Sequence, residues 1–325
     1  MSQHISYFDF IRGIAILMVV AIHTYIAGDF ITVDGTARMI FRQLLNCSVP
    51  IFLALSGFFL GKKNFDTRSV QSFWKKQIPK VYIPCIVWSL PLFVFSILGG
   101  ASVWKQVVYL IVCGFSIYYF IALIIQYYLL LPILQKALKR NLIISIFSSV
   151  VSISIITILL SVKGMSLPLI LYAGCFFVWI VFYMLGVYYS QNERNYSLKL
   201  TLLVVIVGFI LSCIEAYYLH THFGKGNGIK LSAFIYSYGI VLLFLHPRIE
   251  TLYRENVLTS FIAYIGKISF GIYLIHCYII SIVSKFFISD SWFLNWIVVS
   301  ALTILTIAIV RRFLPQKINK YIGFS

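Results

Sequence analysis

Long apolar runs, divided by short basic segments, are the feature that most limits how this chain can fold. A helix of about 20 apolar residues crosses the roughly 30 Å hydrocarbon core of a bilayer. Of the 325 residues, 61% are hydrophobic and 11% are charged, whereas soluble domains carry about 25% charged residues. The sequence therefore predicts an all-α, polytopic membrane protein.

About ten membrane spans are expected, within a single domain that covers residues 1–325. The stretch 99–114 is interrupted and short, and it is interpreted as an interfacial or re-entrant piece. We expect the first run to remain as a span, because it lacks a small-residue cleavage site and further spans follow it. The expected spans lie at about 8–27, 40–61, 81–99, 116–135, 142–162, 168–190, 200–219, 231–246, 265–287 and 293–313.

The distribution of Lys and Arg predicts the orientation in the membrane. Most of the 26 basic residues fall on one side if the N-terminus is cytoplasmic, including six in the segment 62–80. Arg38 and Arg42 fall on the other side. By the positive-inside rule, both termini are expected to be cytoplasmic. The net charge of +17 is thus interpreted as topology signals and lipid contacts, and nucleic-acid binding is not expected.

No metal site is expected from the sequence. The six cysteines are scattered without a CxxC pair, so both metal and disulfide frameworks fail on spacing. His220 and His222 are two residues apart, which is a weak metal signal without a matched set of further ligands.

The first apolar run carries Asp9, Arg12 and His23. Arg12 and His23 are eleven residues apart, which on a helix is about three turns plus 20°, so they share one face about 16 Å apart. Asp9 precedes Arg12 by three residues and can pair with it. Ionisable side chains inside a span indicate function. The alternative is that Arg12 anchors the cytoplasmic end and His23 ends a packed bundle.

Other polar residues lie within later spans. Ser269, Tyr273 and His276 follow one another at i, i+4 and i+7, so they share one face and line either a cavity with His23 or a hydrogen-bonded seam between helices. The segment 48–57 contains a proline and a Ser-Gly pair, which favour close helix packing or open backbone groups toward a cavity. Glu215 lies near the outer end of its span and is a candidate to pair with His23, orient an acceptor or bind a cation.

Three blocks of the sequence resemble the integral-membrane acyltransferase-3 family. They are Ile11-Arg-Gly-Ile-Ala15 followed by His23, then Val49-Pro-Ile-Phe-Leu-Ala-Leu-Ser-Gly-Phe58, and then Ile265-Gly-Lys-Ile-Ser-Phe-Gly-Ile-Tyr-Leu-Ile-His276. Their order and spacing match, and the resemblance covers essentially the whole chain. Where family members usually read His-Leu-Trp-Tyr/Phe-Leu, this chain reads Ser116-Ile-Tyr-Tyr-Phe120.

The resemblance implies about ten helices and a membrane O-acyltransferase, most often an O-acetyltransferase. Such a protein moves an acyl group from acyl-CoA, usually acetyl-CoA, to a hydroxyl of a cell-envelope saccharide or glycolipid in a bacterial inner or plasma membrane. Acyl-CoA is then a donor substrate, and no bound cofactor is expected. Many relatives carry a hydrolase-like domain after the last helix; here we expect transfer to be completed in the membrane domain.

The resemblance also implies that Arg12 and His23 are the essential pair. His23 suits the role of base for the incoming hydroxyl, and Arg12 suits contact with the donor phosphates. The remaining candidates hold the acceptor or orient His23: Asp9, Tyr119, Glu215, Ser269, Tyr273 and His276.

A transporter or flippase for a sugar or an amino acid is the main alternative, with Arg12, His23 and Glu215 as a buried charge relay. The stretch Cys213-Ile-Glu-Ala-Tyr-Tyr-Leu-His220 is faintly similar to the membrane domains of vancomycin-resistance serine racemases, which are associated with serine uptake. An inverted repeat would favour transport, and none is evident in the sequence.

Overall fold

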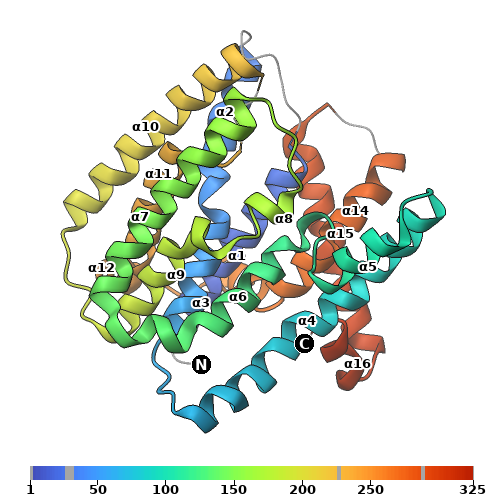
Figure 1. The fold of residues 1–325 in the computed structure, drawn as a ribbon, viewed down its shortest axis with the longest axis horizontal. Helices are drawn as coiled ribbons and strands as arrows, with labels where there is room; N and C mark the ends of the chain where they lie inside the picture. The colour runs from blue at the N-terminus through green and yellow to red at the C-terminus, as the bar shows by residue number, and fades with distance from the viewer. Residues whose placement is uncertain (1–2, 26–32, 225–227, 287–289, 325) are drawn as a thin grey trace.

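A computed structural model describes residues 3–25, 33–224, 228–286 and 290–324. Within these residues the chain forms helices and no strand (Figure 1), so the all-α fold class is confirmed. Seven helical segments are long and apolar enough to cross a membrane: Ser6–His23, Asp34–Leu60, Arg68–Leu98, Ser116–Val162, Leu198–Phe223, Ser269–Phe286 and Trp292–Phe313. Three shorter apolar helices, Phe176–Gln191, Leu231–Leu245 and Val257–Lys267, accompany them.

The helices follow one another with short connections. The α-helices are α1 Gln3–His23, α2 Val33–Leu44, α3 Ser48–Leu60, α4 Thr67–Leu98, α5 Val103–Ile111, α6 Tyr119–Leu134, α7 Leu138–Thr157, α8 Leu169–Tyr172, α9 Phe176–Gln191, α10 Leu198–Phe223, α11 Leu231–Leu245, α12 Pro247–Leu252, α13 Val257–Lys267, α14 Ser269–Phe286, α15 Trp292–Phe313 and α16 Gln316–Tyr321. There are three single 3₁₀ turns in the described chain. Turn η1 Leu45–Cys47 joins α2 to α3, η2 Ser116–Tyr118 precedes α6, and η3 Gln135–Ala137 joins α6 to α7. A π-helical turn, η4 Ile158–Val162, follows α7.

Each of the ten expected spans overlaps one or more of these helices, with different boundaries, whereas seven segments of the described residues are long and apolar enough to cross a membrane. The third begins at Thr67 instead of about residue 81, so much of the basic segment lies on α4. A capping box explains the early start: Asp66 accepts from the amide of Ser69 at 2.7 Å while the Ser69 hydroxyl accepts from the amide of Asp66, which satisfies two free donors of the first turn.

Two further boundaries differ from expectation. The sixth expected span is a four-residue helix, α8, followed by α9. The ninth is divided at Ile268, where α13 ends and α14 begins one residue later, and α13 itself was not expected. The helix α5 has nine residues, which is too short to span a bilayer.

Glycines let the central helices touch backbone to backbone. At Gly266 of α13, a Cβ would lie 1.8 Å from the carbonyl oxygen of Asp9, and at Gly13 of α1, 2.0 Å from that of Ile262. A Cβ at Gly57 of α3 would lie 2.2 Å from the carbonyl oxygen of Tyr183 in α9. Of the two roles expected for the Ser-Gly pair, close packing thus applies to Gly57.

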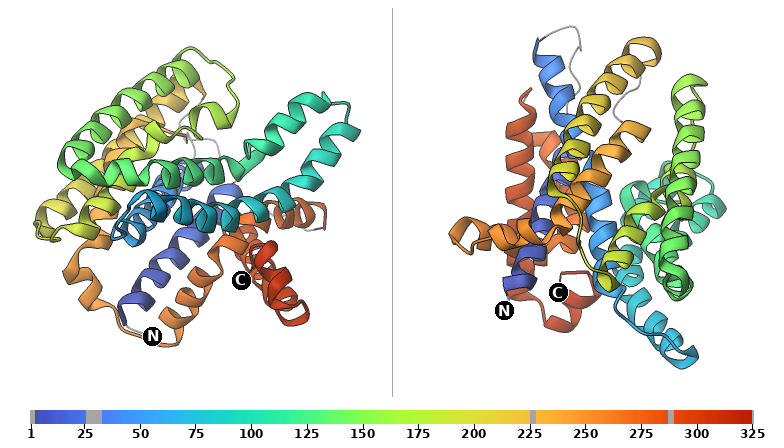
Figure 2. Two further views of the ribbon diagram at one scale, coloured as in Figure 1. Left: turned by 60° about the horizontal axis from the view of Figure 1, so that its bottom comes forward. Right: turned by 90° about the vertical axis from the view of Figure 1, so that its left-hand side faces the viewer.

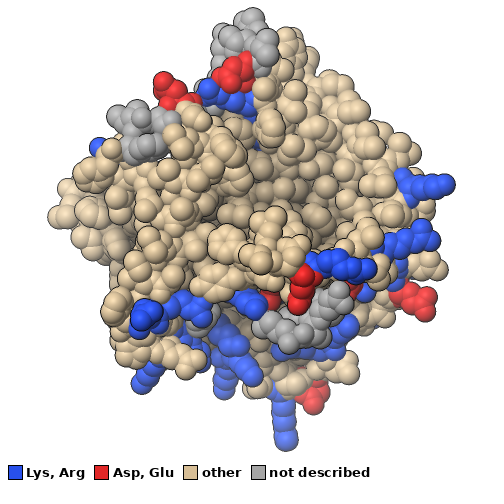
Figure 3. Space-filling view, turned by 180° about the vertical axis from the view of Figure 1, so that it is seen from behind, with Lys and Arg blue, Asp and Glu red and all other residues tan. Residues whose placement is uncertain are grey.

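The chain ends and many basic side chains gather at one end of the bundle. Both termini lie toward the bottom in two views that share a vertical axis (Figures 1 and 2). In the view from behind, most Lys and Arg atoms lie in the lower half of the surface, below a broad uncharged band (Figure 3). Helix α1 begins at this lower end and runs toward the opposite end, where α2 lies (Figure 2).

Candidate functional site

His23 is the last residue of α1, and two tryptophans hold this end of the helix. The indole N–H of Trp292 donates to the carbonyl of Ala21 at 2.9 Å, and that of Trp296 donates to the carbonyl of Leu17 at 2.9 Å. The last four carbonyls of a helix have no partner within the helix, and that of Ala21 is one of them. Contacts from α15 therefore fix the position of His23.

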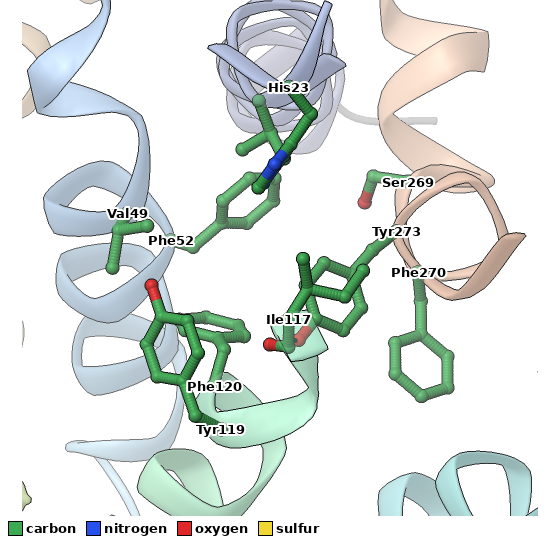
Figure 4. A pocket seen from close by; sticks show the side chains of 10 residues that line it. His23, Val49, Phe52, Ile117, Tyr119, Phe120, Ser269, Phe270 and Tyr273 are labelled. Atoms are coloured by element: carbon green, nitrogen blue, oxygen red, sulfur yellow. Dashed lines mark hydrogen bonds between the residues drawn. The ribbon is translucent and has the colours of Figure 1, made fainter. Parts of the chain in front are cut away.

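An apolar cavity of about 120 Å³ opens on one side of His23. Figure 4 shows the imidazole entering it from α1, facing side chains from α3, from the η2–α6 segment and from α14. The lining residues are Val19, His23, Val49, Phe52, Ile117, Tyr119, Phe120, Ser269, Phe270 and Tyr273. Two of the three residues of the expected polar stripe, Ser269 and Tyr273, thus lie with His23.

A second, more polar cavity of about 240 Å³ shares His23 with the first. Val19, Val49 and Tyr119 also line both cavities. The polar residues of the second cavity include Arg42 and Asn46. His23 and Tyr119 thus stand between an apolar cavity and a cavity that carries a positive charge.

The third stripe residue, His276, lies beside His23. The two rings are 5.1 Å apart between centroids, and His276 is 0% exposed. Its Nδ1 lies 3.0 Å from the carbonyl oxygen of Ile272 and 2.9 Å from that of Tyr273. Carbonyl oxygens only accept, so Nδ1 carries the proton and Nε2 of the neutral ring is an acceptor. This buried Nε2 has no hydrogen-bond partner in the described part of the chain.

Three potential metal ligands meet at the same place. Ligand atoms of His23, His276 and Cys277 all lie within 4.8 Å of one another. Two imidazoles and a thiol are ligand types that zinc accepts. The sequence did not indicate this set, because His23 is distant along the chain from the adjacent pair His276 and Cys277, and only the fold brings α1 to α14.

Tyr273 also forms a helix–helix contact. Its hydroxyl donates to the carbonyl of Ile117. Tyr273 therefore has both of the roles expected for these residues, because it lines the cavity and also forms a hydrogen bond between two segments. Ser116 precedes Ile117 with a φ of 47°, a left-handed conformation that is uncommon for a residue with a side chain. This strained turn delivers Ile117, Tyr119 and Phe120 to the cavity (Figure 4).

Asp9 and Arg12 lie near the middle of α1, which runs from Gln3 to His23. Arg12 donates to the Asp9 carboxylate at 3.0 Å, as the spacing predicted, and its guanidinium lies 4.8 Å from the ring centroid of Phe59. Because α1 is one helix from Gln3 to His23, Arg12 and His23 are about 16 Å apart along its axis. Arg12 lines neither of the two cavities that His23 lines.

Glu215 lines neither cavity. Its carboxylate accepts from the backbone amide of Ser232 at 3.0 Å and from the Ser232 hydroxyl. Ser232 is in the first turn of α11, where amides lack partners within the helix and a negative charge is favourable. Glu215 thus stabilises the start of α11.

A polar network that the sequence did not predict lies beside the second cavity. Arg42 donates to Asn46 Oδ1, and Asn46 donates to Gln43 Oε1 at 2.9 Å. The same oxygen of Gln43 also accepts from Lys230 and from Ser212. The four-residue spacing of Arg42 and Asn46 in an apolar segment is the sequence signal for this network.

The comparisons with known proteins support one family. A family model described as an acyltransferase domain, that of the acyltransferase-3 family, matches residues 5–311. No curated protein and no solved structure matches the chain. The match covers nearly the whole chain, including both cavities and α1. The chain therefore belongs to the acyltransferase-3 family and is a membrane acyltransferase.

Proposed function

We propose that the protein transfers an acyl group, most simply acetyl, from acyl-CoA to a hydroxyl of a cell-envelope saccharide or glycolipid. The observation that carries this proposal is the place of His23, between an apolar cavity and a polar one. An acyl chain is accommodated by apolar surroundings and a sugar by polar ones, and the thioester and the hydroxyl must meet at one base for transfer to occur.

In the proposed reaction, an unprotonated nitrogen of His23 removes the proton from the acceptor hydroxyl. The oxygen attacks the thioester carbonyl, and the carbon–sulfur bond breaks as the tetrahedral oxyanion collapses. The proton then passes from His23 to the sulfur, so that an ester and free CoA leave. The Tyr119 hydroxyl points into the cavity (Figure 4) and is a candidate to hold the acceptor or the oxyanion.

His276 is proposed as a positioning residue for this base. The ring that carries this buried Nε2 acceptor lies 5.1 Å from the His23 ring between centroids, and in the proposed arrangement an N–H of His23 donates to Nε2 and leaves the other His23 nitrogen as the base. A partner that fixes the tautomer of a catalytic histidine is a common requirement for general-base catalysis.

Arg12 is proposed to bind the donor phosphates. An arginine is always charged and bonds phosphate with a two-pronged geometry. The rise of about 16 Å along α1 suits a donor that reaches from its phosphates near Arg12 to a thioester at His23. The termini and many basic side chains gather at the end of the bundle where α1 begins (Figures 2 and 3), which supports a cytoplasmic location for that end, and Arg12 lies closer to it than His23 does.

The test uses the purified protein in liposomes with radiolabelled acetyl-CoA and a mixture of envelope saccharides and glycolipids. Transfer of label to an acceptor, with release of free CoA, is expected. If the liposomes accumulate a sugar or serine while acetyl-CoA stays intact, the protein is a transporter and the proposal is wrong.

A further inference from the structure

The cavity that joins His23 to Arg42 contains a positive charge that no carboxylate of the described residues pairs with. Arg42 lies on α2 and lines the cavity together with Asn46. Its described bond goes to the neutral amide oxygen of Asn46, and no carboxylate forms an ion pair with it in the described ranges. A guanidinium has five N–H donors, so most of its donors stay available to a ligand.

The neighbouring arginine shows a different arrangement. Arg38, one turn earlier on α2, has its charge balanced by Asp34, with 2.6 Å between the two side chains. Arg38 does not line the cavity. Within the part of the chain that the structure describes, Arg38 thus has a carboxylate partner, whereas Arg42 lines the cavity and has none.

One amide oxygen beside Arg42 serves several donors at once. Gln43 Oε1 accepts from Asn46, Ser212 and Lys230, although a carbonyl oxygen has only two lone pairs. The nearby carboxylate of Glu215 is bonded to Ser232 at the start of α11. Taking an arginine out of water costs free energy unless an anion or acceptors compensate it. An added anion would provide those acceptors.

We propose that this cavity binds the acceptor through an anionic group, a carboxylate or a phosphate, that pairs with Arg42. This inference rests on the acyl-transfer function proposed above and names its acceptor class: an acidic or phosphorylated saccharide. His23 lines the same cavity, so an anion held at Arg42 places a neighbouring hydroxyl near the base. Arg42 is therefore a specificity-determining residue.

Binding is measured by isothermal titration without any acyl donor, with glucuronate, glucose 6-phosphate and glucose as probes. The wild-type protein is expected to bind at least one of the two anions more tightly than glucose, and the stronger one identifies a carboxylate or a phosphate as the natural group. In Arg42→Gln, the preference for the anion should fall by about tenfold to a hundredfold, the effect of losing a charged hydrogen-bond pair. Arg42→Lys, which keeps the charge, should retain part of it.

Arg38→Gln is the matched control on the same helix, and its preference should equal that of the wild type. The thermal unfolding midpoint of each variant shows whether it is folded. Binding that is equally strong, or equally undetectable, for acidic and neutral probes in the wild type would overturn the inference, as would an unchanged preference in a folded Arg42→Gln.

Release of free CoA from acetyl-CoA by the wild type is measured separately. If no CoA is released while the wild type still binds the anion through Arg42, the proposed function is contradicted and the acceptor class is not. If CoA is released but anion binding does not depend on Arg42, the acceptor class is contradicted and the acyl-transfer function is not.

Discussion

His23 at the end of α1 and His276 in α14 hold their rings 5.1 Å apart between centroids. The two residues are distant in sequence, and the helix–helix contacts of α1, α14 and α15 bring them together. The buried Nε2 of His276, an acceptor without a partner in the described chain, lies beside the residue that lines both cavities. Since a buried polar atom without a partner costs free energy, a bond from His23 is its simplest compensation.

This relationship predicts the behaviour of two His276 variants. His276→Ala should lower kcat by about threefold to tenfold, the value of one lost hydrogen bond, with little change in KM for acetyl-CoA. His276→Gln, whose side-chain oxygen can accept, should recover part of the loss. The pH profile of kcat distinguishes positioning from packing, because loss of the partner should shift the profile in His276→Ala. An unshifted profile and no recovery in His276→Gln would indicate a packing role.

Arg12 is predicted to act on donor binding. Arg12→Ala should raise KM for acetyl-CoA by about tenfold to a hundredfold, because a charged hydrogen-bond pair is lost, while Arg12→Lys keeps part of the affinity. Arg140 is an exposed arginine in the first turn of α7, and Arg140→Ala is the control. Equal KM values for Arg12→Ala and Arg140→Ala would contradict the phosphate contact.

The close contact of α1 with α13 is predicted to be sensitive to a single methyl group. A Cβ at Gly266 would lie 1.8 Å from the carbonyl oxygen of Asp9, so Gly266→Ala must push α13 away. Overpacking of this kind costs about 1–3 kcal/mol, and the midpoint of thermal unfolding in detergent should fall. A Cβ at Gly228 has nothing within 4 Å, and Gly228→Ala should keep the wild-type midpoint. A stable Gly266→Ala would show that the helices are less tightly packed than described.

The proposed mechanism uses His23 as a base, and catalysis is therefore predicted to survive removal of metal. Treatment with EDTA should leave CoA release unchanged, although His23, His276 and Cys277 have ligand atoms within 4.8 Å of one another. Loss of activity that added zinc restores would place a metal at this cluster. Cys277→Ser would then be expected to weaken zinc binding, and the base role of His23 would be wrong.

Much of the fold follows from periodicity and hydropathy. The long apolar runs predicted an all-helical membrane chain, and the spacing of Asp9 and Arg12 predicted their ion pair, since both are local properties of one helix. The start of α4 at Thr67 was missed because the hydropathy signal is weak in a basic segment, whereas the capping box of Asp66 and Ser69 determines the start. The break at Ile268 was not predicted. Next to it, Gly266 packs against the backbone of α1, and a contact between segments distant in the sequence leaves no local pattern.

The candidate site was predictable only in part. Arg12 and His23 followed from the rarity of ionisable residues in spans, and the face shared by Ser269, Tyr273 and His276 followed from their spacing. The second cavity could not be predicted, because Arg42, Tyr119 and His23 come from three separate segments. Glu215 was a candidate by its chemistry alone, and its bonds to Ser232 depend on the packing of α10 against α11.

The most direct test of the central claim is the rate of thioester cleavage by His23→Ala. Purified wild type, His23→Ala and His222→Ala are given radiolabelled acetyl-CoA and acceptor, and released CoA is measured; His222 is an exposed histidine of α10 outside both cavities. We predict that His23→Ala loses about a hundredfold to ten-thousandfold in kcat, the usual effect of removing a general base, while His222→Ala keeps the wild-type rate. A folded His23→Ala that cleaves acetyl-CoA as fast as His222→Ala would contradict the claim that acyl transfer takes place at His23.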